Sequence, residues 1–228
     1  MNAQHQRLAP AGIRQILEEY YRPLPEGIEE EVQKYMDLLA SWGQKMSLTT
    51  IREPEEVVRA HFGESIFALS LGKFSEGRLA DVGAGAGFPG LAIKLAIPEL
   101  SVTLIEPNKK KCAFLQEVAR SLSLTGVSAI SFPFWTAKIS ENSLESVSVR
   151  ALAIDKDLLK WSHAALQASG RIFLWLGEED CRQVASSNVR EWSWDAPILI
   201  PGSKRRYILR GAPTKKSKKN RSSLLDPH

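Results

Sequence analysis

The fold is decided by the stretch Arg78-Leu-Ala-Asp-Val-Gly-Ala-Gly-Ala-Gly-Phe-Pro-Gly-Leu-Ala-Ile-Lys-Leu-Ala96. Its short apolar run, residues 79–82, predicts a buried parallel strand, and the apolar pattern of residues 88–97 predicts a helix. Three glycines spaced by single residues lie between them. Glycine accepts positive φ, and without a Cβ it lets backbone amides approach a ligand beside a helix N-terminus. The turn therefore predicts a ligand site, although its Gly-x-Gly-x-Gly spacing differs from the Gly-x-Gly-x-x-Gly of dinucleotide-binding proteins.

A carboxylate at the end of the next predicted strand supplies the second part of this signal. That strand, residues 101–106, ends on Glu106, which follows Gly83 by 23 residues. In βαβ units an acidic residue about 20 residues beyond the glycine turn reaches the ribose hydroxyls of a nucleotide. Together the turn and Glu106 indicate an adenosine-type ligand. Taken singly, the turn also fits an ordinary strand-to-helix connection, and Glu106 also fits a strand end or a helix cap before Asn108.

Strands and helices alternate along the rest of the chain. Strands are predicted at residues 126–131, 146–150 and 170–177, and helices at 108–124, 155–167 and 178–186. Two further strands, 191–200 and 205–210, are joined across Pro201-Gly202 and are expected to form an antiparallel pair. Five strands that alternate with helices, followed by a terminal pair, are typical of the class I methyltransferase fold. The predicted architecture is thus a Rossmann-like α/β fold with a seven-stranded, mostly parallel sheet.

Helical patterns precede the sheet. Apolar residues recur at helical spacing in residues 11–21, 28–45 and 53–69, and these helices are expected to cover one face or edge of the sheet. With 228 residues, 43% of them hydrophobic, the chain can hold one main domain and an extension. We therefore divide it into an N-terminal helical extension (1–72), a Rossmann-like domain (73–211) and a basic tail (212–228) expected to be disordered.

The formal net charge of +4 resides in the tail. Five Lys and Arg residues against one Asp in residues 215–228 account for all of it. Such a tail fits an electrostatic arm for RNA phosphates, whose affinity falls as salt rises. It fits equally well a solubilising terminus without a specific partner.

Several classes of protein are disfavoured by composition. No apolar run of about 18 residues and no charged-then-apolar N-terminus is present, so neither a membrane span nor a signal peptide is expected. Cys112 and Cys181 are far apart and form no Cys-x-x-Cys, which favours a reduced, cytoplasmic setting over a zinc site. His61 and His163 lie on helical patterns and are interpreted as structural, so no metal site is predicted.

Five sequence motifs resemble those of one family. They are Trp42-Gly-Gln-Lys-Met-Ser-Leu-Thr-Thr-Ile51, His61-x-x-Glu64-Ser65, Asp81-Val-Gly-Ala-Gly-Ala-Gly-Phe-Pro-Gly90, Lys110 with Phe114-Leu115, and Val149-Arg150-Ala151. In this order they resemble the bacterial RsmG (GidB) family, of which the chain looks like a divergent member. The resemblance implies methyl transfer from S-adenosylmethionine to guanine N7 of 16S ribosomal RNA. The implied partner is 16S ribosomal RNA or the small ribosomal subunit.

The resemblance also implies a set of site residues. Those at the cofactor would be Asp81, Gly83, Gly85, Gly87, Phe88, Glu106, Phe134, Trp135 and Arg150, with Glu106 on the ribose hydroxyls. Two departures from the family pattern stand out. Relatives usually have an Arg-x-Glu-type word after the third strand, where Pro133-Phe134-Trp135 offers no carboxylate. They also usually have a lysine where this chain has Leu176. Both changes remove polar groups from the implied active side.

The methyl transfer that the resemblance implies needs no general base, in agreement with the absence of a general-base motif from the sequence. Guanine N7 has a free lone pair and no proton to lose, so methyl transfer should need proximity and orientation rather than a general base. No His/Asp/Ser constellation is visible. We expect Arg150, at the end of the fourth strand, to be the catalytic residue, as an organiser that contacts the cofactor or the target loop. A strand-end arginine paired with a carboxylate is the alternative interpretation.

Other functions fit parts of the sequence. An NAD(P)-dependent oxidoreductase would use the glycine turn, but the glycine spacing and the lack of a Tyr-x-x-x-Lys or hydride-relay arrangement disfavour it. A non-catalytic RNA- or ribosome-binding descendant of the fold would explain the lost polar groups and the basic tail. Methylation of a small molecule is a third alternative. A monomer is expected in each case.

Overall fold

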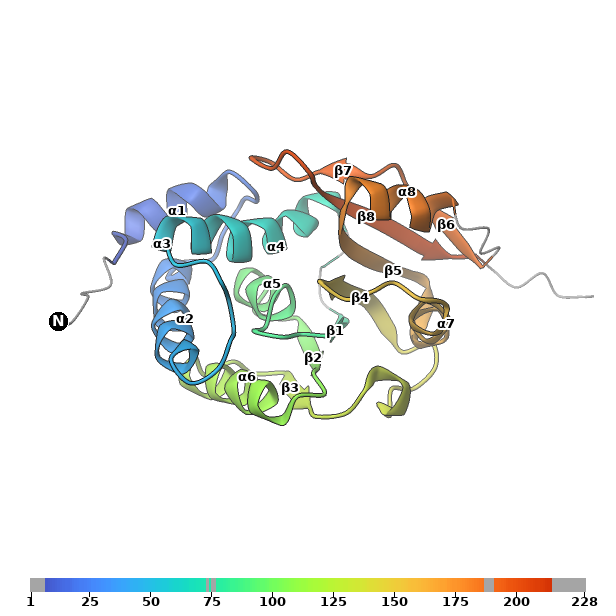
Figure 1. Ribbon diagram of the computed structural model, residues 1–228, viewed down its shortest axis with the longest axis horizontal. Helices are drawn as coiled ribbons and strands as arrows, with labels where there is room; N and C mark the ends of the chain where they lie inside the picture. Colours follow the sequence, from blue (N-terminus) through green and yellow to red (C-terminus); the bar gives the residue numbers. More distant parts are fainter. Residues whose placement is uncertain (1–6, 73, 75–76, 187–190, 215–228) are drawn as a thin grey trace, which may run out of the picture.

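The computed structural model describes residues 7–72, 74, 77–186 and 191–214. These residues form one mixed sheet of eight strands with helices on both faces (Figure 1). The strand order is β3-β2-β1-β4-β5-β8-β6, and β7 also pairs with β8. Strands β1 to β5 are mutually parallel, whereas β8 is antiparallel to β5. The Rossmann-like, class I methyltransferase fold predicted from the sequence is confirmed.

The elements follow the predicted alternation. The strands are β1 (Arg78–Val82), β2 (Ser101–Ile105), β3 (Val127–Ile130), β4 (Leu144–Arg150), β5 (Leu166–Gly177), β6 (Trp192–Trp194), β7 (Ile198–Leu199) and β8 (Arg206–Pro213). The helices are α1 (Pro10–Glu18), α2 (Ile28–Gly43), α3 (Pro54–Val57), α4 (Glu64–Ile66), α5 (Gly90–Ala96), α6 (Lys109–Ser121), α7 (Lys156–Ala165) and α8 (Glu178–Ser186). A π-helical segment, Val58–Gly63, joins α3 to α4, and short 3-10 turns span Phe67–Leu71 and Phe134–Thr136.

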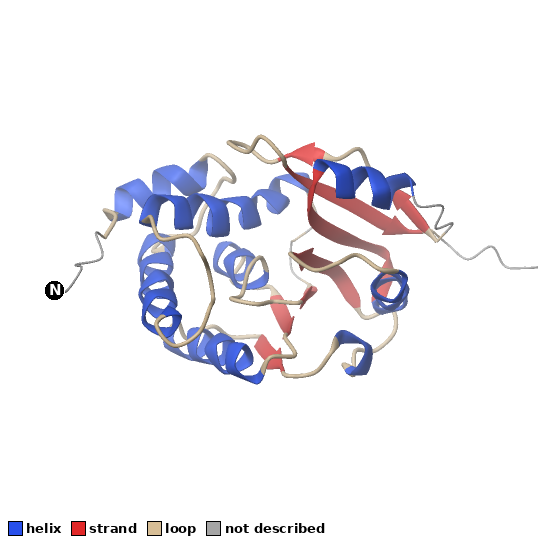
Figure 2. Ribbon diagram, in the orientation of Figure 1, coloured by secondary structure: helices blue, strands red, loops and turns tan. Residues whose placement is uncertain are grey.

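Two hydrophobic cores lie on opposite faces of the sheet. Helices cover both of these faces (Figure 2). Alternate residues of β1 point to opposite faces, so Leu79 belongs to one core and Ala80 and Val82 to the other. The first core is covered by α5, α6 and the N-terminal helices, and the second by α7 and α8. Strands buried on both faces are near-continuously apolar, which is why the run at residues 79–82 is so clear in the sequence.

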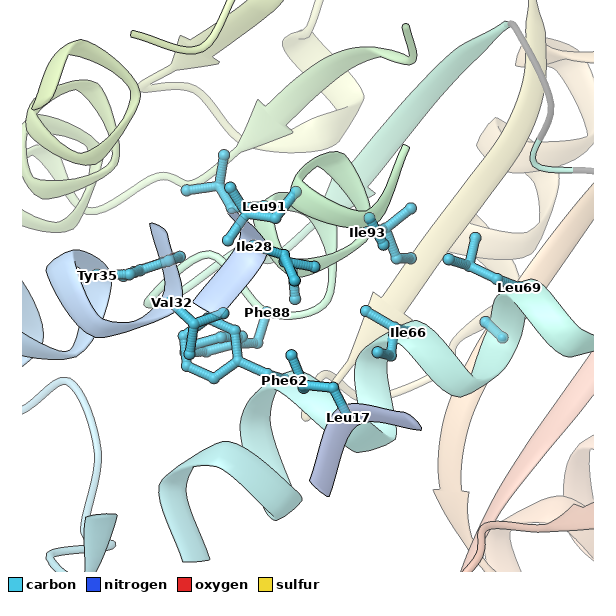
Figure 3. Packing of buried hydrophobic residues seen from close by; sticks show 14 of the residues in the cluster. Leu17, Ile28, Val32, Tyr35, Phe62, Ile66, Leu69, Phe88, Leu91 and Ile93 are labelled. Carbon is cyan, nitrogen blue, oxygen red and sulfur yellow. The ribbon is translucent and has the colours of Figure 1, made fainter. Parts of the chain in front are cut away.

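The N-terminal helices pack on the α5 and α6 side of the sheet. Figure 3 shows Tyr35 of α2, Phe62 and Leu91 of α5 in one cluster of buried side chains. The Tyr35 ring lies edge-on to Phe62, with ring centroids 5.3 Å apart, and packs near Phe114 of α6 at 6.2 Å. The predicted covering of one sheet face is therefore observed, while the division at residue 72 stays a prediction.

The C-terminal strands differ from the expected pair. The predicted strand over residues 191–200 is split into β6 and β7, which both pair with β8. Pro197 lies in the interruption and has no N–H to donate to a ladder, so the strand cannot run through it. The sheet therefore has eight strands rather than seven.

Several boundaries also differ from the prediction; β5, for example, begins at Leu166, inside the range predicted for the preceding helix. The helix after the glycine turn begins at Gly90 rather than at Phe88, because a residue before proline is disfavoured in the α region. Strand β8 extends to Pro213. Residues 215–228, which hold the basic charges of the tail, lie outside the described residues. Among the described residues, no helix is long and apolar enough to cross a membrane.

Candidate functional site

The carboxyl ends of four neighbouring strands bring the predicted residues to one edge of the sheet. Val82 of β1 is in register with Ile105 of β2 and with Val149 of β4, and Ile105 is in register with Ile130 of β3. The sheet order β3-β2-β1-β4 fixes the sequence of groups along that edge. The turn Phe134–Thr136, which follows β3 in the chain, comes first, and Glu106, the glycine turn and Arg150 come after it. In open α/β sheets, ligands bind in the crevice outside these strand ends.

Glu106 links the glycine turn to the end of β2. Its Oε2 accepts a 2.9 Å hydrogen bond from the backbone N–H of Gly85, and its Oε1 accepts a 2.8 Å bond from that of Asn108. The residue is 7% exposed. An ionised carboxylate has about four acceptor positions, so these two bonds leave acceptors for the vicinal hydroxyls of a ribose. These free acceptor positions thus fit the ribose of an adenosine-type cofactor. The side chain of Asn108 caps α6 by accepting from the N–H groups of Lys110 and Lys111.

The glycine turn has a backbone that few other residues could adopt. Gly83, Gly85 and Gly87 have φ values of +73°, +57° and +90°. Gly87 is also closely surrounded, since a Cβ there would overlap the hydroxyl of Tyr35 and lie 2.8 Å from Leu91 Cδ1. The turn is therefore held from behind by α2 and α5, and both conformation and space require glycine at its last position.

Asp81 lies beneath the turn and is fully buried. Its Oδ1 accepts from the hydroxyl of Ser148 at 2.7 Å, and its Oδ2 accepts from the N–H of Gly90 at 2.9 Å. Burial raises the pKa of Asp81 to about 6, although these two hydrogen bonds oppose the rise. The carboxylate thus links the end of β1 to the beginning of α5. Any effect of Asp81 on a ligand is indirect, through the conformation of the glycine turn.

Phe88 lies inside an aromatic stack rather than at the surface. Its ring stacks on Tyr35 at a centroid distance of 5.4 Å and on His61 at 4.7 Å, with interplanar angles of 12° and 13°. Phe88 is 8% exposed. The residue therefore connects the glycine turn to the N-terminal helices, a packing role that its place in the sequence did not indicate.

The two aromatic residues after β3 have different surroundings. Phe134 is buried and packs edge-on against Trp135 at 4.9 Å and Trp161 of α7 at 5.8 Å. Trp135 is 68% exposed, and nearby Phe132 is 60% exposed. Phe134 therefore anchors the short turn Phe134–Thr136. Trp135 presents an indole ring to solvent at the edge where the ligand crevice is expected.

Arg150 points towards the N-terminal helices and pairs with a buried carboxylate. Its Nη2 lies 3.2 Å from Oε2 of Glu64 and donates to the carbonyl of Ala60 at 2.8 Å. Its Nη1 lies 3.4 Å from the Ser65 hydroxyl. Burial lowers the pKa of the Arg150 guanidinium, while Glu64 opposes this shift. The interpretation of Arg150 as a strand-end arginine paired with a carboxylate therefore describes the observed geometry, and a direct contact with a ligand stays a prediction.

A cavity of about 450 Å³ opens beside this pair, beyond the ends of β4 and β5. Its lining residues are Glu64, Arg150–Ala153, Trp175–Gly177, Asp180 and Arg206. The side chain of Leu152 lies against the glycine turn, because a Cβ on Gly83 would be 3.4 Å from Leu152 Cδ2. Leu152 therefore lies between the cavity and the glycine turn and borders both.

His61 is a neutral, structural histidine at ordinary pH. Its Nε2 lies 2.6 Å from Oγ1 of Thr49. Burial, with smaller contributions from Arg150 and Arg206, lowers the pKa of His61 to about 4. Among the described residues, no group of three or more His, Cys, Asp or Glu side chains could hold a metal ion.

Comparison with known proteins identifies the family. The family model of GidB, described as rRNA small subunit methyltransferase G, matches residues 28–196, about three quarters of the chain. The chain belongs to the GidB family. A GidB protein from Chloroflexus aggregans, ribosomal RNA small subunit methyltransferase G, is 32% identical over 196 residues, which are 82% of each chain. The protein of that name from Caldanaerobacter subterraneus is 44% identical over 102 residues, 44% of this chain and 43% of that one.

Solved structures agree on the fold. An S-adenosylmethionine-dependent methyltransferase from Aquifex aeolicus superposes with a TM-score of 0.61 at 12% identity, covering 71% of this chain and 94% of that one. At this identity the likeness concerns the fold alone. The GidB chain described here thus combines the family's sequence with the class I methyltransferase architecture.

Three residues of this GidB chain lie at the candidate site without a clear signal in the sequence. Tyr35 belongs to the apolar pattern of residues 28–45, and Glu64 to the motif His61-x-x-Glu64-Ser65. Arg206 lies 142 residues from Glu64 and carried no local signal. No spacing rule links residues so far apart, so the structure was needed to bring them together.

Proposed function

We propose that this protein transfers the methyl group of S-adenosylmethionine to N7 of a guanine in 16S ribosomal RNA. The observation that carries the proposal is the hydrogen bond from the Gly85 N–H to Glu106, which joins the two halves of a nucleoside site in a GidB chain. Neither a reductase nor a non-catalytic descendant of the fold gains support from the relatives.

The cofactor would lie over the glycine turn. Glu106 would accept hydrogen bonds from the ribose hydroxyls, and the exposed ring of Trp135, anchored by Phe134, would cover one face of the adenine. Gly83, Gly85 and Gly87 would bring the backbone close to the cofactor, while Asp81 and Phe88 would hold the turn in shape. With no carboxylate after β3, recognition of the adenine amino group would rest on the backbone or on water.

The reaction needs an oriented base rather than a proton acceptor. When bound, S-adenosylmethionine supplies an electrophilic methyl group whose bond to sulfur breaks as the N7 lone pair attacks, leaving the electron pair on sulfur and a positive charge on the guanine ring. N7 carries no proton, so none of the residues at the site has to accept one. The residues of the chain would therefore act by binding and orienting the target base.

The target guanine would enter the cavity beside Arg150. The volume of the cavity, about 450 Å³, lies within the range of pockets that enclose small ligands. Leu152 lines the cavity and also lies against Gly83, so a base in the cavity would lie next to the glycine turn. Arg150 would organise this site. We further propose that the protein acts as a monomer, in the cytoplasm, on small-subunit RNA either free or assembled.

A labelling experiment tests the proposal. Purified protein, methyl-labelled S-adenosylmethionine and 16S ribosomal RNA from cells that lack the modification are incubated together, with RNA from modified cells as the control. We expect label only in the unmodified RNA. Binding of RNA without labelling would favour a non-catalytic descendant, and turnover without RNA would favour a small-molecule substrate. A thermal shift with NAD but not with S-adenosylhomocysteine would favour a reductase.

A further inference from the structure

One buried carboxylate joins two walls of the cavity. Glu64 of α4 has a side chain only 3% exposed, and it pairs with arginines from two different strands of the sheet. Its Oε2 lies 3.2 Å from Nη2 of Arg150 at the end of β4. Its Oε1 lies 2.5 Å from Nη2 and 2.8 Å from Nε of Arg206, at the beginning of β8. Arg206 therefore forms a two-pronged pair with a single carboxylate oxygen.

The backbone around Glu64 is fixed by two further hydrogen bonds. The indole N–H of Trp175 in β5 donates to the carbonyl of Glu64 at 2.8 Å, and Arg150 donates to the carbonyl of Ala60 at the same distance. The segment 60–65 is thereby attached to β4, β5 and β8 at once. A carboxylate held in this way has little freedom to move, so the two guanidinium groups are held as well.

The charge balance of the cavity depends on the same residue. Arg150 is mostly buried, with a side chain 17% exposed, whereas the Arg206 side chain is 56% exposed. Removing one partner of a buried pair leaves an uncompensated charge in a medium that solvates it poorly. Without the Glu64 carboxylate, two cations would face the cavity with only Asp180 among the lining acids to offset them.

We propose that Glu64 is a positioning residue for methyl transfer, which holds Arg150 and Arg206 at the target-base cavity and offsets their charge as the guanine ring becomes positive. This inference rests on the proposed function. Both arginines are donors only, and guanine presents O6 as an acceptor next to N7. Arginines held by Glu64 can bind O6 and leave the N7 lone pair free for the methyl group.

The test compares acid-to-amide substitutions at two ion pairs. Glu64→Gln removes the charge at the cavity, and Glu64→Asp keeps it on a shorter side chain. Glu29→Gln is the matched control, because Glu29 forms a partly buried pair with Arg14 at 2.9 Å in the N-terminal helices, and Arg14 and Glu29 do not line the cavity. For each variant we would measure kcat and KM with 16S ribosomal RNA, the affinity for S-adenosylhomocysteine, and the melting temperature.

We expect Glu64→Gln to lower kcat by about 100-fold, the effect of misplacing a group by about 1 Å, with unchanged affinity for S-adenosylhomocysteine. Glu64→Asp, which keeps the charge on a shorter side chain, should restore part of the rate, and Glu29→Gln should keep it. If Glu64→Gln does not fold, Arg206→Lys keeps the charge but loses the two-pronged pair, and should still lower kcat. A wild-type kcat in Glu64→Gln or Arg206→Lys would overturn this inference alone. Absence of labelling by the wild-type protein would overturn the proposed function with it.

Discussion

The hydroxyl of Tyr35 donates a 2.6 Å hydrogen bond to the backbone carbonyl of Ala86, inside the glycine turn. A helix of the N-terminal extension thus supports the loop that we propose binds the cofactor. Tyr35 is fully buried, and burial raises the pKa of its hydroxyl well above the ordinary value, so it remains a donor. Helix α2 is therefore part of the structural support of the glycine turn.

Tyr35→Phe should loosen this support. The Ala86 carbonyl would lose its partner in a partly buried place, which costs about 1 kcal/mol. We expect a lower melting temperature and weaker binding of S-adenosylhomocysteine, measured by thermal unfolding and calorimetry. Tyr21→Phe, which removes a hydroxyl just after α1, is the control and should change neither. Unchanged affinity in Tyr35→Phe would show that the turn keeps its shape without α2.

Gly87→Ala should be strongly destabilising. The φ of +90° is unfavourable for alanine, and the added Cβ would overlap the Tyr35 hydroxyl. Strain of this kind costs about 1–3 kcal/mol before the overlap is counted. Gly12→Ala in α1 is the matched control, since a Cβ there has nothing within 4 Å and alanine favours helix. Urea unfolding should show a loss for the first variant and a small gain for the second. Equal stabilities would contradict the geometry of the turn.

Glu106→Gln should weaken cofactor binding. The amide has one acceptor oxygen, so it cannot accept from both Gly85 and Asn108 and also hold two ribose hydroxyls. Loss of charge-assisted hydrogen bonds worth about 1.5–3 kcal/mol corresponds to at least about 10-fold weaker binding. Titration calorimetry with S-adenosylhomocysteine measures this directly. The surface variant Glu117→Gln should bind as the wild type does; a Glu106→Gln affinity equal to that of the control would exclude Glu106 from the ribose site.

His61 should make the fold sensitive to acid. Its folded-state pKa of about 4 lies below the ordinary value of 6.5, so the unfolded chain binds a proton that the folded chain does not. This contribution to stability is complete above pH 6.5 and is lost as the pH falls towards 4, with a magnitude on the order of 3 kcal/mol. Asp81 acts in the opposite direction, because its pKa of about 6 exceeds the ordinary 3.8 and favours the folded state as the pH falls through 6.

His61→Phe separates the two groups. The phenyl ring can keep the stack on Phe88 but cannot be protonated, although the contact with Thr49 is lost. We expect urea unfolding free energies of the variant to fall less than those of the wild type between pH 7 and pH 5. Identical pH dependences would assign the acid sensitivity to other groups.

The local parts of this structure could be predicted from the sequence. The turn from β1 to α5, the acid after β2 and the Asn108 cap each depend on residues close together in the chain, so their patterns are visible in it. Pro197 is a local signal for the interruption between β6 and β7, because proline cannot donate to a strand ladder.

The support of the site could not be predicted in the same way. Tyr35 meets Ala86 across 51 residues, and Arg206 meets Glu64 across 142. These contacts depend on the sheet order and on how the N-terminal helices pack on α5 and α6. The sequence shows such residues only as members of an apolar stripe or as isolated charges, and their partners appear once the chain is folded.

Nucleoside analysis after turnover directly tests the proposed methyl transfer to guanine N7 of 16S ribosomal RNA. RNA from cells that lack the modification would be incubated with the protein and methyl-labelled S-adenosylmethionine, digested to nucleosides and separated by liquid chromatography with mass detection. We predict that the label appears in 7-methylguanosine. Label in any other nucleoside, or RNA that stays unlabelled, would contradict the account.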